Sequence, residues 1–237
     1  MSIINVNSFG TFFSFLKSAF LLDDSKKYNF GSPNINEFGI GISFEKGHIE
    51  NKPLLGAGFV SALANVFRNN YPFQVATNAG VHITAHELGH AGAAYALTGK
   101  CSEIAIKIDQ CAGETHIPRC VTKLAGWKKT VIDVAGPMAD VALCACKLMG
   151  ASALRNFSSS IAPSSPATSV ALSSATGVLA FGAMIWIAGE LTYAFCGVVN
   201  RNEVDDFKKI ADRGKIHLAV ASLALVTECA LALAIFC

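Results

Sequence analysis

The run HELGH at residues 86–90 places two imidazoles and a carboxylate within five positions. In a helix, His86 and His90 are four residues apart and therefore project from the same face, one turn apart. Two imidazoles at this spacing can ligate one zinc ion, and Glu87 can then act as a general base toward a water on that ion. Zinc lowers the pKa of such a water toward neutrality. The pattern therefore predicts a hydrolytic zinc centre with one ion per chain.

The alternative to a zinc site is a buried helix whose polar side chains pair with their neighbours. It has to account for three ionisable groups within five positions of an apolar segment, where such groups are costly and by default mark function. We therefore favour zinc binding by His86 and His90. His82 lies one turn before His86 and is expected to support or pack against the site, because the motif is complete without it.

The composition of the chain is typical of a membrane protein. Hydrophobic residues make up 52% and charged residues 15% of the 237 positions, whereas ordinary soluble domains carry roughly 25% charged residues. Most Lys and Arg residues are clustered, and the stretches between the clusters are almost uncharged. The net charge of +2 is small, and no basic block is interleaved with aromatic residues, so nucleic acid is not expected as a partner. The expected surroundings are the lipid bilayer.

Five apolar segments are candidate membrane spans, and the second of them carries the HELGH run. The segment SEIAIKID at 102–109 alternates apolar and other residues, which predicts a strand. The fold class expected is an all-α polytopic membrane protein with about five transmembrane helices and a short strand or hairpin after the HExxH helix. The first span is short for the roughly 20 residues that a crossing needs. The segments are 53–67, 75–98, 130–150, 168–199 and 216–237.

The Lys and Arg residues of the connecting segments predict the orientation. Segments 1–52, 99–129 and 200–215 carry five, six and five of them, whereas the turn after the first span has only Arg68 and the expected Ser/Pro-rich loop at 151–167 has only Arg155. Since basic loops stay on the cytoplasmic side, the N-terminus is expected in the cytoplasm and the C-terminus outside, in a multi-pass protein of a bacterial inner membrane. The HELGH run, the start of the third span and the 200–215 segment then lie on the same side.

The N-terminal residues 1–52 are expected to form a cytoplasmic or membrane-surface region, followed by an integral membrane domain at 53–237. Residues 9–22 predict either an amphipathic surface helix or a short docked segment. The remainder up to residue 52 is polar and rich in Gly and Asn, with no interpretable motif. Five of the eight cysteines lie in apolar runs, and the other three, Cys101, Cys111 and Cys120, are spaced too widely for a metal knuckle. All are expected to be reduced thiols, a disulfide being the minor alternative.

Three features together resemble the site-2 protease family of intramembrane zinc proteases. They are HELGH on a span, the strand-like 102–109 segment, and AGPMAD at 135–140, which is similar to the family's AGPxAN with Asp140 in place of Asn. The resemblance covers roughly residues 75–210. It implies a zinc-dependent endopeptidase that hydrolyses peptide bonds in or near transmembrane segments of membrane-protein substrates. It also gives Gly136, Pro137 and Asp140 a supporting role.

The third zinc ligand is the point at which this chain departs from the family. The family supplies an Asp from a run of the form NxxPxxxLDGGRI, and the nearest run here is NRNEVDDFKKI at 200–210. Aligning Asp206 with the family's Asp places Lys209 on its basic residue, so Asp206 is the preferred ligand. Asp205 and Glu190 are the alternatives, and Glu228 is a further candidate. A solvated charged loop is the other interpretation of the 200–210 run.

Two further expectations concern the residues around these motifs. Gly136 and Pro137 are expected to bend the backbone or to begin a helix, and Asp133 and Asp140 to cap or orient that helix start. A substrate helix must unwind before it is cut, and the 102–109 strand can bind the unwound segment as an added strand. The main alternative function is a non-catalytic integral membrane protein, either a degenerate protease or a metal-binding or transport scaffold. Four long apolar runs disfavour a soluble zincin-like domain.

Overall fold

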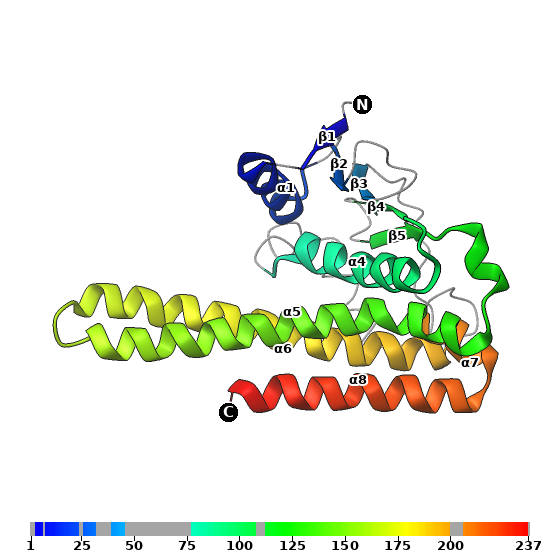
Figure 1. Cartoon of the computed structure of the whole chain (residues 1–237). Coiled ribbons are helices and arrows are strands. Elements are labelled where there is room, and N and C mark those ends of the chain that lie inside the picture. Colours follow the sequence, from blue (N-terminus) through cyan, green and yellow to red (C-terminus); the bar gives the residue numbers. More distant parts are fainter. Residues whose placement is uncertain are drawn as a thin grey trace.

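The structure is a computed structural model that describes residues 3–6, 8–23, 26–31, 39–45, 77–107, 112–199 and 206–236. Helix α4 lies between a five-stranded sheet on one side and a layer of long helices on the other (Figure 1). The helices are α1 (Phe9–Leu21), α4 (Ala79–Thr98), the 3-10 helix η2 (Arg119–Lys123), α5 (Gly126–Ile161), α6 (Pro166–Val199), α7 (Asp206–Arg213) and α8 (Lys215–Phe236).

The sheet has the strand order β1-β2-β3-β4-β5, so β1 and β5 are its edges among the described residues. The pairs β1–β2 and β3–β4 are parallel, while β2–β3 and β4–β5 are antiparallel. The predicted strand at 102–109 is present as β4, and with β5 it forms a hairpin directly after the HELGH helix. The strands are β1 (Ile3–Asn5), β2 (Lys27–Gly31), β3 (Gly39–Glu45), β4 (Glu103–Lys107) and β5 (Ala112–His116).

One face of the sheet packs against α1 and α4. Because side chains alternate between the two faces of a strand, Ile42 and Phe44 of β3 and Ile104 and Ile106 of β4 point the same way and are buried together. Helix α1 contributes Phe15 to this cluster. The helix predicted at 9–22 is therefore present and docked on the sheet, and it also leaves large apolar side chains exposed on its outer face, with Phe9 80% exposed.

Glycines allow α4 to approach its neighbours closely on both sides. A Cβ at Gly80 would lie 1.9 Å from the carbonyl oxygen of Ala19 in α1. A Cβ at Gly89, inside the HELGH run, would lie 2.1 Å from the carbonyl oxygen of Ala135 in α5. Both positions therefore require glycine, and the second one determines how deeply the motif helix sits against α5.

The long helices α5 and α6 form an antiparallel hairpin that extends beyond α4 and α8 (Figure 1). Their shared core with α8 includes Leu148, Ile187 and Leu225. Near the tip, the Ser158 hydroxyl lies 2.8–2.9 Å from hydroxyls of α6 and donates to the Ser169 carbonyl at 2.7 Å. The chain reverses only at residues 162–165. The expected loop at 151–167 is therefore wrong over most of its length, because α5 continues to Ile161.

The expected all-α fold with five spans is wrong, because the chain is mixed α/β. Of the described helices, two are long and apolar enough to cross a membrane, judged by length and composition: Pro166–Phe195 in α6 and Lys215–Ile235 in α8. Of the other expected spans, residues 79–98 are helical in α4 and residues 130–150 are helical in α5, but neither α4 nor α5 meets this criterion for crossing a membrane. The weak span at 53–67 and the domain boundary at residue 52 lie outside the described residues.

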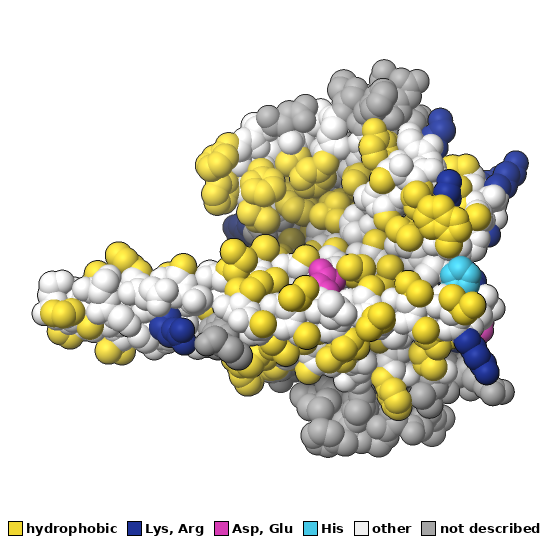
Figure 2. Space-filling view, turned by 60° about the horizontal axis from the view of Figure 1, so that its bottom comes forward, with side chains coloured by type: hydrophobic (Ala, Val, Ile, Leu, Met, Phe, Trp, Pro, Cys, Tyr) yellow, Lys and Arg dark blue, Asp and Glu magenta, His cyan; other side chains and the backbone are white. Residues whose placement is uncertain are grey.

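The outer surface of the helical layer is largely apolar. Hydrophobic side chains cover much of the face in Figure 2, and most of the Lys and Arg side chains in that view gather toward one side of the molecule. Such extended apolar cover is typical of surfaces that contact lipid or another protein. The exposed large side chains of α6 and α8 include Phe181, Phe195, Val220, Leu223 and Leu231.

The cysteines that can be assessed are free thiols, as expected: Cys101, Cys120, Cys144, Cys146 and Cys229. Cys111 and Cys237 lie outside the described residues, and the Cys196 side chain is not among those described.

The close contact at Gly89 predicts a position-specific response to alanine. Gly89→Ala is expected to lower the free energy of unfolding by about 1–3 kcal/mol, because the new methyl group displaces α5. Gly92→Ala, three residues along the same helix with open space around it, is the matched control and is expected to stabilise the helix by up to about 1 kcal/mol. Denaturant unfolding followed by circular dichroism measures both. Equal effects at the two positions would contradict the packing described here.

Candidate metal centre

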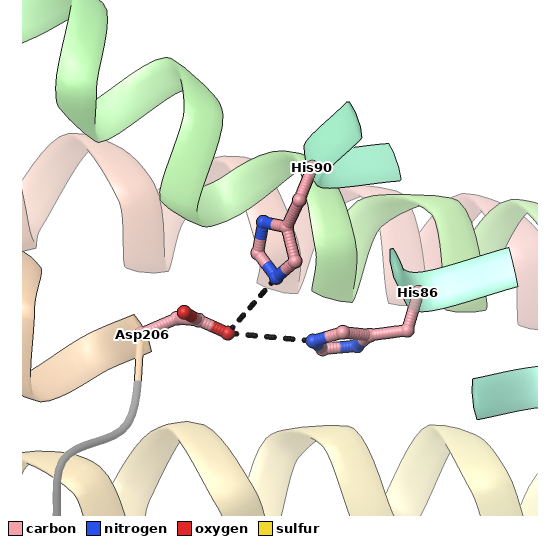
Figure 3. A group of neighbouring side chains, drawn as sticks. All are labelled: His86, His90 and Asp206. Atoms are coloured by element: carbon pink, nitrogen blue, oxygen red, sulfur yellow. Dashed lines mark hydrogen bonds and ion pairs between the residues drawn. The ribbon is translucent and has the colours of Figure 1, made fainter. Parts of the chain in front are cut away.

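Helices α4 and α7 bring three potential metal ligands together. The Nε2 atoms of His86 and His90 lie 3.3 Å and 3.1 Å from the same carboxylate oxygen, Oδ2 of Asp206 (Figure 3). The histidines are neighbours because they occupy successive turns of α4, whereas Asp206 reaches them as the first residue of α7. The structure thus places the preferred third ligand beside the two histidines, although more than 100 residues separate them in sequence.

The hydrogen bonds on the far side of each imidazole indicate which nitrogen carries the proton. Nδ1 of His90 lies 2.7 Å from the carbonyl oxygen of Ile132, and Nδ1 of His86 lies 3.1 Å from Oδ2 of Asp140. A carbonyl or carboxylate oxygen can only accept, so both Nδ1 atoms donate. In the neutral rings both Nε2 atoms then carry lone pairs. These lone pairs face the Asp206 carboxylate, so three electron-pair donors converge on one point.

This convergence fits a metal ion well. The ligand atoms of His86, His90 and Asp206 lie within 4.8 Å of one another. Two imidazoles and one carboxylate are a donor set that zinc accepts, and three protein ligands leave a fourth position for water or substrate. A positive ion at this point would relieve the mutual repulsion of the lone pairs and the carboxylate.

The surroundings of Asp206 keep it ionised and oriented. Lys209 donates to Oδ1 at 3.0 Å, and the Tyr193 hydroxyl donates to Oδ2 at 3.2 Å while accepting from the Asp206 backbone N–H. Burial opposes ionisation of Asp206. Without a metal ion, however, protonated His86 and His90 rings would donate N–H to this carboxylate, and together with the charge of Lys209 they hold the pKa of Asp206 well below its usual range. Asp206 is 7% exposed, so the interpretation of this run as a solvated loop is wrong at this position.

Strand β5 holds Glu87, the expected general base. Thr115 Oγ1 donates to Oε2 of Glu87 at 2.5 Å, and a Cβ at Gly113 would lie 2.4 Å from Cγ of Glu87. The edge strand therefore both orients this carboxylate and leaves space for it. Glu87 is buried. Its negative charge, together with the larger contribution of Asp206, raises the pKa of Lys209, the residue that donates to Asp206.

The AGPMAD run supports the centre from α5, but not as a helix start. A Cβ at Gly136 would lie 2.3 Å from Nε2 of His90, so glycine is needed for the imidazoles to fit. Pro137 lies inside α5, which begins well before it at Gly126. The expectation that Asp133 and Asp140 cap the helix start is therefore wrong. Asp133 instead pairs with Arg213 of α7, and Asp140 binds two histidines.

The alternative ligands are placed differently. The Glu190 carboxylate lies within 4.8 Å of the ligand atoms of His86 and Asp140, in a group that does not include His90. Its Oε2 atom is buried and has no hydrogen-bond partner among the described residues, and the same holds for Oε2 of Glu228, which belongs to neither group. Asp205 lies outside the described residues.

Three contributors to the site were not anticipated from the sequence. Thr115, Lys147 and Tyr193 come from β5, α5 and α6, and each contacts a residue of the HELGH helix or of α7. Thr115 and Tyr193 had no recognisable signal. Lys147 had one, because a lysine within an apolar helix is costly unless it has a partner.

No family model, no curated protein and no solved structure matches this chain. The interpretation of the centre therefore depends on its geometry and on the chemistry of its residues.

The geometry predicts which carboxylate is the third ligand. Asp206→Asn removes the charge that faces both Nε2 atoms and is expected to weaken zinc binding by about 100-fold or more. Glu190→Gln keeps the size of its side chain and is expected to change the affinity by less than about threefold, because Glu190 is not grouped with His90. Competition with a zinc chelator measures both. The reverse order of the two effects would make Glu190 the ligand.

The fit of Gly136 to the imidazoles predicts a second effect on metal binding. Gly136→Ala is expected to reduce zinc affinity by about tenfold or more, because the methyl group displaces Nε2 of His90 from its position. Gly150→Ala, on the same helix with nothing within 4 Å of its Cβ position, is the control. A zinc dissociation constant unchanged in Gly136→Ala would show that the histidines do not bind metal in this arrangement.

Proposed function

We propose that this protein is a zinc-dependent endopeptidase that hydrolyses peptide bonds in or near transmembrane segments of membrane-protein substrates. The observation that carries the proposal is the convergence of two imidazole nitrogens and one carboxylate oxygen, from His86, His90 and Asp206. Glu87, next to His86 in the sequence, is buried and is held by the edge strand β5. Two imidazoles, one carboxylate and an adjacent Glu are the parts that metal-assisted hydrolysis requires.

Each residue has a defined task in this reaction. When bound, zinc would polarise the scissile carbonyl and acidify a water molecule. His86, His90 and Asp206 would hold the ion through Nε2, Nε2 and Oδ2. Glu87 takes the proton of the attacking water and passes it to the leaving amine, while the Thr115 hydroxyl keeps the glutamate oriented.

The substrate would bind along β5 rather than along the 102–109 strand. Strand β4, which contains most of that segment, has β3 on one side and β5 on the other, so neither of its edges can accept another strand. β5 is an edge strand among the described residues, and Thr115 on it contacts Glu87. An unwound substrate segment added to β5 would bring its peptide groups next to the proposed base.

We further propose that the protein is integral to the membrane through α6 and α8, in a bacterial inner membrane. Both helices are long and apolar enough to cross, and their outer faces carry large apolar side chains. Lys208, Lys209 and Arg213 lie on α7 between them, and loops rich in Lys and Arg favour the cytoplasmic side. This orientation would put Asp206, and with it the metal centre, near the cytoplasmic face.

The proposal is tested by comparing wild type with Glu87→Gln, which keeps the size of the side chain and removes its basicity. Wild type is expected to carry about one zinc per chain and to generate fragments of membrane proteins that disappear in Glu87→Gln, with the zinc content unchanged. His86→Ala is expected to lose both zinc and cleavage. Glu103→Gln, at an exposed glutamate on β4, is the control and should cleave like wild type. Mass spectrometry of isolated membranes and metal analysis provide the measurements.

Identical fragment patterns for wild type and Glu87→Gln would refute the protease assignment. Zinc retained in such a protein would then favour the alternative, a non-catalytic membrane protein that binds or transports metal.

A further inference from the structure

Behind His86, a chain of side chains connects α4 with α5. Lys147 Nζ lies 2.8 Å from Nε2 of His82, and Nδ1 of His82 lies 2.8 Å from Oδ1 of Asp140. The other carboxylate oxygen of Asp140 lies 3.1 Å from Nδ1 of His86. His82 and Asp140 are almost fully buried, at 0% and 1% exposed, and Lys147 is half-buried.

The directions of these hydrogen bonds follow from the chemistry of each group. An ammonium group can only donate, so Nε2 of His82 accepts from Lys147 and its Nδ1 donates to Asp140. Asp140 thus accepts one N–H from each histidine. The chain is internally consistent, with every group used as a donor or an acceptor, and it leaves the Nε2 lone pair of His86 facing Asp206.

The position of His82 is fixed by packing as well. Its ring stacks on Trp186 of α6, with centroids 4.2 Å apart and planes 13° apart. The indole N–H of Trp186 in turn donates to the carbonyl oxygen of Thr77 at 2.8 Å, just before α4 begins. Three helices therefore hold the His82 ring at the point where it meets Asp140.

We propose that Lys147, His82 and Asp140 act as one positioning unit for the metal ligand His86, and that His82 is the reason an aspartate is required at position 140. An asparagine there would present an NH₂ group to one of the two N–H donors that converge on it. Because the two N–H groups meet different atoms, Oδ1 and Oδ2, a carboxylate is needed to offer each of them an acceptor oxygen. This inference rests on the proposed metal centre, which gives the orientation of His86 its purpose.

The consequence for the metal is direct. A carboxylate that accepts from the distal nitrogen of a ligating histidine fixes the tautomer and the ring orientation and makes the ligand more basic. Here that carboxylate is itself held from the other side, so a change at His82 is transmitted to the metal through two hydrogen bonds without contact between His82 and the ion.

A double-mutant cycle tests the unit. Asp140→Asn is expected to weaken zinc binding by about 10–100-fold, and His82→Phe, whose ring can still stack on Trp186, by about tenfold. Once His82 is replaced by Phe, the NH₂ group that Asp140→Asn introduces no longer faces a donor. The Asp140→Asn step is therefore expected to cost about tenfold less in the His82→Phe background than in wild type. Asp212→Asn and His116→Phe, both at exposed positions, are matched controls.

Zinc affinity is measured by chelator competition, and the visible absorption of the cobalt-substituted protein reports the ligand geometry independently of activity. If the fold-changes in zinc affinity of the two single variants simply multiply in the double variant, the inference is overturned. Lys147→Met provides a second route if either single variant does not fold. It is expected to lower zinc affinity about threefold to tenfold by releasing the tautomer of His82, and an unchanged affinity in this variant would equally overturn the proposal.

Failure of this inference is distinguishable from failure of the proposed function. A wild-type protein that binds no zinc, with or without His86, would remove the metal centre itself. A wild-type protein that binds zinc and loses it in His86→Ala, but shows no coupling between positions 82 and 140, would leave the metal centre intact and remove only the positioning unit.

Discussion

The close packing of α4 against α5 is the constraint on which the rest of the site depends. Gly89 lets the α4 backbone approach the carbonyl of Ala135, and Gly136 leaves the space that the imidazoles of His86 and His90 occupy. Hydrogen bonds form only within a narrow range of donor–acceptor distances. A wider separation of these helices would therefore break the contacts of the histidines with Asp140 and Ile132. The two Nε2 atoms would then lose their orientation toward Asp206.

The parts of the site that could be predicted are those encoded by local spacing. The four-residue step from His86 to His90 places both rings on one helical face whatever the rest of the chain does. Asp206 could be predicted because the partial match of residues 200–210 to the protease family's motif and the distribution of basic residues both indicated the same segment. Tyr193 and Thr115 follow from no spacing, because they depend on where α6 and β5 pack, and that is a property of the whole fold.

The fold itself was predicted poorly for a physical reason. A span prediction averages hydropathy over about 20 residues, whereas the missed strands β2 and β3 have five and seven residues. The alternation of Ile40, Ile42 and Phe44 in β3 is clear once the sheet is known, but glycines and polar neighbours conceal it. The serines of segment 151–167 caused the opposite error, because a loop was expected where α5 in fact continues to Ile161. Those at the end of α5 satisfy their hydroxyls on helix carbonyls and on α6 and so continue the helix.

The ionisable residues of α4 and α5 lie in the interior of a helical layer whose outer surface, formed by α6 and α8, is largely apolar. Charged groups at the centre have partners across helix interfaces, as Asp140 has two histidines and Asp133 has Arg213. Meanwhile α6 and α8 direct large hydrophobic side chains outward. In an apolar solvent an unpaired buried charge costs far more than a paired one. The same polar groups that keep α4 and α5 from qualifying as lipid-facing spans are therefore the ones that a shielded metal centre needs. Helix α6 contributes to both, because it directs Tyr193 and Trp186 inward and leaves its large apolar side chains exposed on the other side.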